Sequence, residues 1–61
     1  MKRIGSRCRD YRLNVLGLKQ SDVADEIGYS KESVSAFENG RNNNAVILMY
    51  YINHGLDLER T

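Results

Sequence analysis

Lys31 and Glu32 are neighbouring residues whose side chains form hydrogen bonds of opposite direction. A lysine can donate to guanine O6 and N7, and a glutamate can accept from cytosine N4, so the two could distinguish bases. Each residue also has a simpler interpretation. Lys31 could contact only a phosphate, and Glu32 could stabilise the first turn of a helix through the helix dipole. Their chemistry therefore indicates hydrogen bonding to a polar partner.

Other reactive residue types do not assemble into a site. His54 is the one histidine, and no serine, cysteine or acid stands at a spacing that would make it a base. Cys8 falls on the apolar face of an expected helix and is better explained as core. Three acids between residues 22 and 26 lack the further oxygen ligands of a metal site. We expect no enzymatic activity, no catalytic residue, no metal and no cofactor.

The apolar spacing predicts an all-α chain. Ile4, Cys8, Tyr11 and Val15 recur at intervals that place them on one face of an amphipathic helix. Glycines and capping residues then divide the rest of the chain. The expected helices are approximately 3–15, 20–27, 31–39 and 45–54, in a single domain 1–61. The fold class is a compact bundle of four short helices plus a C-terminal stub.

The two middle helices have the residues of a helix-turn-helix motif. Ala24 is small where the second helix must be crossed, Gly28 tolerates a left-handed turn, and Val34 anchors the third helix. Ser30 is a good N-cap for that third helix, and Asn43 or Asn44 can cap the fourth. In such a motif the later helix usually enters the major groove of DNA.

Composition and charge indicate the cellular location of this domain and the partners it could bind. The chain has 61 residues, one cysteine and a net charge of +1. No run is apolar enough for a membrane span and no signal peptide opens the chain, so we expect a cytoplasmic protein with no membrane partner. The charge is uneven: +5 over residues 1–19, −3 over 20–41 and −1 over the last twenty. A basic first helix permits DNA binding, although a solvated helix face explains it equally well.

The segment Gln20–Arg41 resembles the helix-turn-helix of the Cro/CI-like (Xre) family of phage and bacterial repressors. The resemblance continues through Ile4-Gly5, Arg7, Arg12 and Gly17-Leu18, and covers nearly the whole chain. The ending of the third helix, Phe37-Glu38-Asn39-Gly40-Arg41, is especially similar. The resemblance implies a bundle of four or five helices and operator binding by a dimer.

The resemblance also implies roles for individual residues. The residues that would contact bases are Lys31, Glu32, Ser33, Ser35 and Ala36. The residues that would contact phosphates are Gln20, Ser30, Asn39, Arg41 and Asn42. At Ala36 relatives often have a polar side chain, and a methyl group could at most touch a thymine methyl. Arg12 and Glu38 would form a buried structural ion pair.

The chain departs from the family pattern in three places. The stretch from the first helix to Gln20 is one residue longer than usual, which affects the assignment of Arg12. Lys19 replaces the serine or threonine that commonly caps the second helix. The fifth helix is almost missing. Because the fourth helix is apolar around most of its circumference, we expect a candidate dimer surface at Tyr50, Tyr51, Leu56 and Leu58.

Two functions from different classes remain open. The first is a sequence-specific DNA-binding transcriptional regulator that binds a two-fold operator as a dimer and blocks transcription. The second is an antirepressor or protein-interaction module on the same fold, which binds a partner repressor instead of DNA. The acidic middle segment and Ala36 favour the second. The basic first helix, Gln20, Lys31, Asn39 and Arg41 favour the first, which is our preferred interpretation. The expected partners are accordingly double-stranded DNA and a second copy of the chain, in a homodimer that is weak without DNA.

Overall fold

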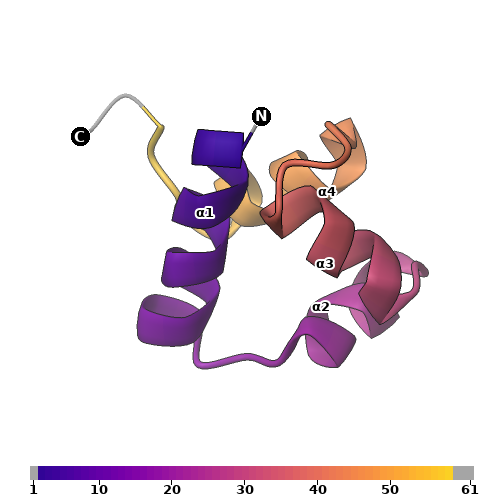
Figure 1. Cartoon of the computed structure of the whole chain (residues 1–61). Helices are drawn as coiled ribbons and strands as arrows, with labels where there is room; N and C mark the ends of the chain where they lie inside the picture. The colour runs from indigo at the N-terminus through magenta and orange to yellow at the C-terminus, as the bar shows by residue number, and fades with distance from the viewer. Residues whose placement is uncertain (1, 59–61) are drawn as a thin grey trace.

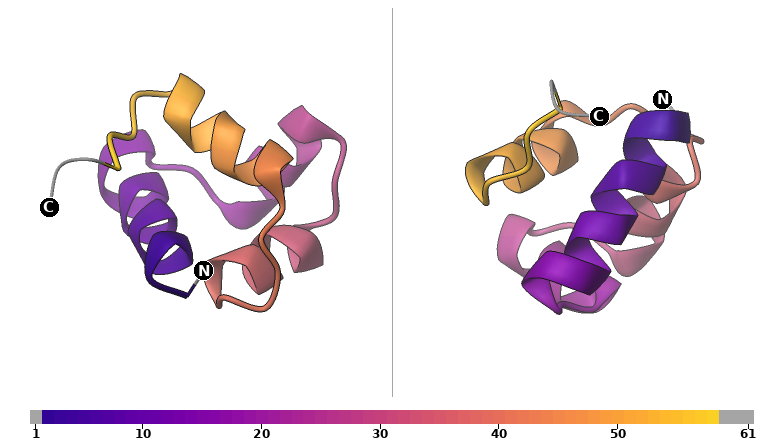
Figure 2. Two further views of the ribbon diagram at one scale, coloured as in Figure 1. Left: turned by 90° about the horizontal axis from the view of Figure 1, so that it is seen from above. Right: turned by 90° about the vertical axis from the view of Figure 1, so that its left-hand side faces the viewer.

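The computed structural model of the chain describes residues 2–58, and its regular elements are all helices (Figure 1). Its elements are α1 (Lys2–Tyr11), the π-helical turn η1 (Arg12–Leu16), α2 (Gln20–Ile27), α3 (Lys31–Glu38) and α4 (Ala45–Asn53). No strand occurs in this part of the chain. The expected all-α, four-helix fold class is confirmed. Seen from above, the four helices surround a common centre (Figure 2).

Side chains from every helix meet in one small core. Phe37, Ile47, Tyr51 and Val23 are fully buried, and Cys8 joins them from α1. Burial of apolar surface of this kind is the main favourable term in folding. Burial also raises the pKa of the Cys8 thiol to about 11, with a further contribution from nearby Glu38. At neutral pH this cysteine is therefore a protonated core residue.

The first helix ends in a π turn, which the sequence pattern did not predict. The carbonyl oxygen of Arg12 accepts hydrogen bonds from the backbone N–H groups of both Gly17 and Leu18, five and six residues later. A π turn holds one more residue than an α turn, so the register changes after Arg12. Val15, expected to face the core, is instead 62% exposed, and Leu16 packs against the core in its place.

Gly5 lets α1 approach the end of α3 closely. A Cβ atom at this position would collide with the backbone carbonyl oxygen of Phe37 and crowd that of Glu38. Only glycine leaves room for this backbone contact. The close approach places the N-terminal half of α1 beside the C-terminal turn of α3.

The turn between α2 and α3 is built by local residue choices. Gly28 has a φ of 73°, in the left-handed region, and Ala24 at the helix crossing is only 2% exposed. The Ser30 hydroxyl accepts from the Ser33 N–H at 3.2 Å and caps α3. At the start of α2, Lys19 has no acceptor to offer, but Asp22 accepts from the Lys19 N–H at 2.9 Å. This carboxylate compensates in part for the missing cap.

The segment after α4 is held against α1 by side chains of that helix. The Arg7 guanidinium donates to the carbonyl oxygens of Asp57 and Leu58, both at 3.0 Å. The Tyr11 hydroxyl donates to the carbonyl oxygen of His54 at 2.8 Å. The expected C-terminal stub contains no helical turn up to Leu58, and the rest of it lies outside the described residues.

The expected dimer surface is wrong for its two tyrosines. Tyr51 is fully buried and Tyr50 is 7% exposed, so neither can form a surface for a partner. Both rings can be buried because their hydroxyls find acceptors: Tyr51 donates to buried Glu38 at 3.1 Å, and Tyr50 donates to exposed Glu26 at 2.7 Å. Leu56 and Leu58 are half-buried. The large apolar side chains that α4 leaves exposed are Val46, Met49 and Ile52.

A buried ion pair joins the first helical run to α3. Arg12 and Glu38 are 5% and 4% exposed. Arg12 donates from Nε to Glu38 Oε2 at 2.8 Å, from Nη2 to Oε1 at 3.1 Å, and from Nη1 to the Leu18 carbonyl oxygen at 2.8 Å. The bond to Glu38 raises the pKa of Arg12, so the guanidinium stays charged. Because every polar atom is satisfied, the charges can be held inside the protein.

We expect Glu38→Ala to destabilise the fold strongly. The substitution would leave the Arg12 guanidinium buried without its counter-charge, a loss of about 3–5 kcal/mol in the free energy of unfolding. Thermal denaturation followed by circular dichroism measures the effect. A Glu38→Ala variant with the melting temperature of the wild type would refute a structural role for the pair.

Stability should also fall at alkaline pH. Burial raises the pKa of Cys8 from 9.0 to about 11, and burial with the bond to Glu26 raises that of Tyr50 from 10.0 to about 12. Both groups are neutral when protonated, so the unfolded chain loses these protons at lower pH than the folded one. Stability is then full below pH 9 and decreases as the pH rises toward 12. Urea midpoints across this range measure it, and a flatter profile is expected for Tyr50→Phe.

Candidate nucleic-acid interface

The N-terminal turn of α3 presents its charged side chains to solvent. Lys31 and Glu32 are exposed, and neither is drawn into an ion pair within the described residues. Ser30, the N-cap, is also exposed, but its hydroxyl is engaged with Ser33. The helix has eight residues, and an α-helix with its side chains is about 10–12 Å across, which suits the width of the major groove.

The remaining candidates on α3 are less accessible. Ser33, Ser35 and Ala36 are half-buried. The Ser33 and Ser30 hydroxyls lie 3.2 Å apart, and the Ser35 hydroxyl lies 3.4 Å from Asn39 Nδ2. Local hydrogen bonds therefore already occupy the two serine side chains. Of the five expected base-contacting residues, Lys31 and Glu32 have the freest side chains.

The residues after α3 form a polar loop with one exposed cation. Asn39 Nδ2 donates to the Ser35 carbonyl oxygen at 2.9 Å, which closes the C-terminal turn of the helix. Arg41 is exposed. The Asn42 side chain accepts from the Asn44 N–H at 3.2 Å. Arg41 and Asn42, together with Gly40 and Asn43, line a shallow hollow of about 270 Å³, in which a phosphate could meet Arg41.

Gln20 begins α2 and lies next to the buried ion pair. Its Nε2 donates to Glu38 Oε1 at 3.1 Å, and its side chain is half-buried. Sequence reasoning placed both residues in the motif but missed this bond. The two positions are 18 residues apart on different helices, and no spacing pattern connects them.

Several acidic side chains of the motif already have hydrogen-bond or ion-pair partners within the protein. Glu38 is compensated by Arg12 inside the core. Glu26 is bound to Tyr50 on α4, and Asp22 is bound to the backbone at the start of α2. Three of the five acids between residues 20 and 41 thus have internal partners. Of these three acids, Glu38 alone is neutralised by a positive side chain, because the neutral donors bound to Asp22 and Glu26 leave their charges in place.

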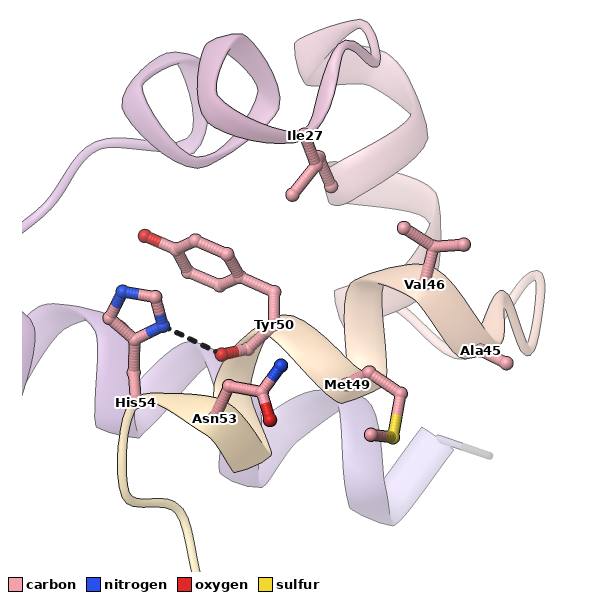
Figure 3. A pocket seen from close by; sticks show the side chains of 7 residues that line it. All are labelled: Ile27, Ala45, Val46, Met49, Tyr50, Asn53 and His54. Carbon is pink, nitrogen blue, oxygen red and sulfur yellow. Dashed lines mark hydrogen bonds between the residues drawn. The ribbon is translucent and has the colours of Figure 1, made fainter.

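An apolar hollow of about 390 Å³ lies on another part of the surface, between α2 and α4 (Figure 3). The His54 ring stacks on Tyr50 with centroids 4.1 Å apart, and its Nδ1 lies 2.8 Å from the Tyr50 carbonyl oxygen. Ile27, Val46 and Met49 line the rest. The histidine is thus occupied with the end of α4, where it contacts neither a nucleophile nor an acid among the described residues.

Two further properties hold for residues 2–58. No group of three or more histidine, cysteine or acidic side chains could hold a metal ion there. Within the same residues, every helix is too short or too polar to cross a membrane.

Comparison with known proteins agrees with the geometry of α2 and α3. A family model described as helix-turn-helix matches residues 9–43, more than half of the chain. The match begins in α1 and ends in the loop after α3, so it contains Gln20, Lys31 and Arg41. Searches of curated proteins and of solved structures gave no match. With an N-cap, a left-handed glycine turn and an exposed second helix in place, the chain belongs to the Cro/CI-like (Xre) helix-turn-helix family of DNA-binding regulators.

Proposed function

We propose that this protein is a sequence-specific transcriptional repressor that binds a two-fold operator as a dimer. The observation that carries the proposal is the exposed N-terminal turn of α3, where Lys31 and Glu32 are free to reach base edges. A helix presented in this way is the element that a helix-turn-helix inserts into the major groove. Ser33, Ser35 and Ala36 follow on the same helix and would complete the base-contacting surface.

The phosphate contacts would come from both sides of that helix. Gln20 is at the first turn of α2, where the positive end of the helix dipole favours an anion. Arg41 is exposed just after α3, with Asn39 and Asn42 beside it, and Ser30 precedes the helix. Contacts of this kind fix the register of a protein on DNA while base contacts give specificity.

A dimer is part of the proposal because one short helix reads only a few base pairs. Two copies related by a two-fold axis would place two recognition helices one helical turn of DNA apart. Since Tyr50 and Tyr51 are in the core, the apolar side chains that α4 offers to a second copy are Val46, Met49 and Ile52. Repression would then be steric, because an occupied operator excludes the polymerase.

The first test is titration of the protein into duplex DNA from around its own gene. We expect tight binding that prefers one sequence over random duplex. The combined variant Gln20→Ala, Lys31→Ala, Arg41→Ala should lose this preference because it removes contacts on both sides of α3. A fluorescence anisotropy titration at near-physiological salt measures the affinity for this duplex and for random duplex.

The matched control is Arg3→Ala combined with Arg9→Ala. Both arginines are exposed on α1, so this variant loses the same number of positive charges at another surface. We expect it to keep the preference for one sequence. If the wild-type protein bound all duplexes weakly and equally, the result would contradict the repressor proposal. It would favour the protein-interaction module, whose partner would be another repressor.

A second test separates the two roles of Lys31. If Lys31 reads a base, Lys31→Ala should cost about 1–3 kcal/mol on the operator and reduce discrimination at one position. If it contacts only a phosphate, binding should weaken equally on all sequences and the salt slope should fall by about one. Titrations at several salt concentrations, on operator and random duplex, distinguish these results. An unchanged affinity on every duplex would remove Lys31 from the interface.

A further inference from the structure

Glu38 makes contact with the expected phosphate-binding residue as well as with its ion-pair partner. Its Oε1 accepts from Arg12 Nη2 and from Gln20 Nε2, both at 3.1 Å. Its Oε2 accepts from Arg12 Nε at 2.8 Å and from the Tyr51 hydroxyl at 3.1 Å. The Glu38 side chain is 1% exposed, so it has no contact with DNA of its own.

The bond to Glu38 determines which way the Gln20 amide faces. An ionised carboxylate can only accept hydrogen bonds, so the amide nitrogen of Gln20 must point toward Glu38 and its carbonyl oxygen away. The nitrogen carries two hydrogens, and Glu38 takes one of them. The second N–H remains for an acceptor outside the protein. Because Arg12 holds both oxygens of the carboxylate, Glu38 cannot turn to release the amide.

We propose that Glu38 is a positioning residue for DNA binding, which fixes the Gln20 amide so that its second N–H meets a phosphate oxygen. This inference rests on the proposed function, because it assumes that Gln20 contacts the DNA backbone. The buried ion pair and the phosphate contact are then parts of one hydrogen-bonded chain. Fixing a side chain before binding avoids the entropy cost of ordering it, which corresponds to about a two- to tenfold gain in affinity.

A purely structural role for Glu38 predicts a different result. In that case the bond to Gln20 only helps to dock α2 on α3, and loss of Glu38 would weaken the contacts to every phosphate alike. A positioning role predicts a loss at one phosphate only. The two roles can therefore be separated by neutralising phosphates singly.

The experiment uses operator duplexes in which one phosphate at a time is replaced by an uncharged methylphosphonate. The phosphate bound by Gln20 is the one whose replacement weakens wild-type binding but not binding of Gln20→Ala. We then expect Glu38→Gln to bind the unmodified duplex about two- to tenfold more weakly than the wild type. On the duplex that lacks this phosphate, Glu38→Gln and the wild type should bind equally. An equal loss on both duplexes would overturn the proposal.

Tyr51→Phe is the matched control. It removes one hydrogen bond from the same carboxylate but leaves the bond between Glu38 Oε1 and Gln20 in place. We expect a lower melting temperature and an unchanged affinity for DNA. If Tyr51→Phe showed the same phosphate-selective loss as Glu38→Gln, the loss would not depend on the bond between Glu38 and Gln20, and the proposal would be wrong.

A measurement on the wild type covers the case in which Glu38→Gln does not fold. The side-chain amide of Gln20 should be rigid in the free protein, with a ¹⁵N order parameter near that of ordered backbone, about 0.85. A value below about 0.6 would show a mobile amide and overturn the positioning role. If Gln20→Ala binds every duplex as tightly as the wild type does, the phosphate contact itself fails, and this part of the proposed function falls with the inference. If only the Glu38 result is negative, the proposed function stands without it.

Discussion

The carboxylate of Glu38 is the group on which the arrangement of this small protein depends. It is carried by α3 and accepts hydrogen bonds from Arg12 in η1, from Gln20 in α2 and from Tyr51 in α4. Every helical element after α1 therefore either carries this carboxylate or donates a hydrogen bond to it. A buried charge is costly unless all its hydrogen bonds are made, so small displacements of any of these elements leave it unsatisfied. The constraint selects one packing arrangement among the many that an apolar core of this size would allow.

The same constraint explains features that look unrelated. Gly5 allows α1 to approach the end of α3, which brings Arg12 within reach of Glu38. The π turn holds one more residue than an α turn would. The extra residue between Arg12 and Gln20 is therefore accommodated while Arg12 keeps its position. Tyr51 can be fully buried because its hydroxyl completes the carboxylate's set of donors. Packing, helix geometry and aromatic burial thus all contribute to the hydrogen bonding of one carboxylate.

The sequence predicts the parts of the fold that local residues determine. Gly28 and Ser30 act within their own turns, so the helix-turn-helix could be found from the sequence, and Lys31 is exposed where its helix begins. Val15 was misplaced because a uniform helical period cannot anticipate a π turn. The burial of Tyr50 and Tyr51 is not predictable from local residues, because their acceptors lie 24 and 13 residues away along the chain. The bond between Gln20 and Glu38 is equally non-local, and only the folded chain reveals it.

The π turn at Arg12–Leu16 has a consequence for how chains of this kind can vary in length. A helix that switches hydrogen-bond pattern for a single turn gains or loses one residue there while the turns on either side keep their positions. A one-residue insertion or deletion at this point can therefore leave Arg12 beside its partner. Counting back from Gln20 is an unsafe way to find the equivalent arginine in a relative. Its hydrogen bonds, and not its position in an alignment, identify it.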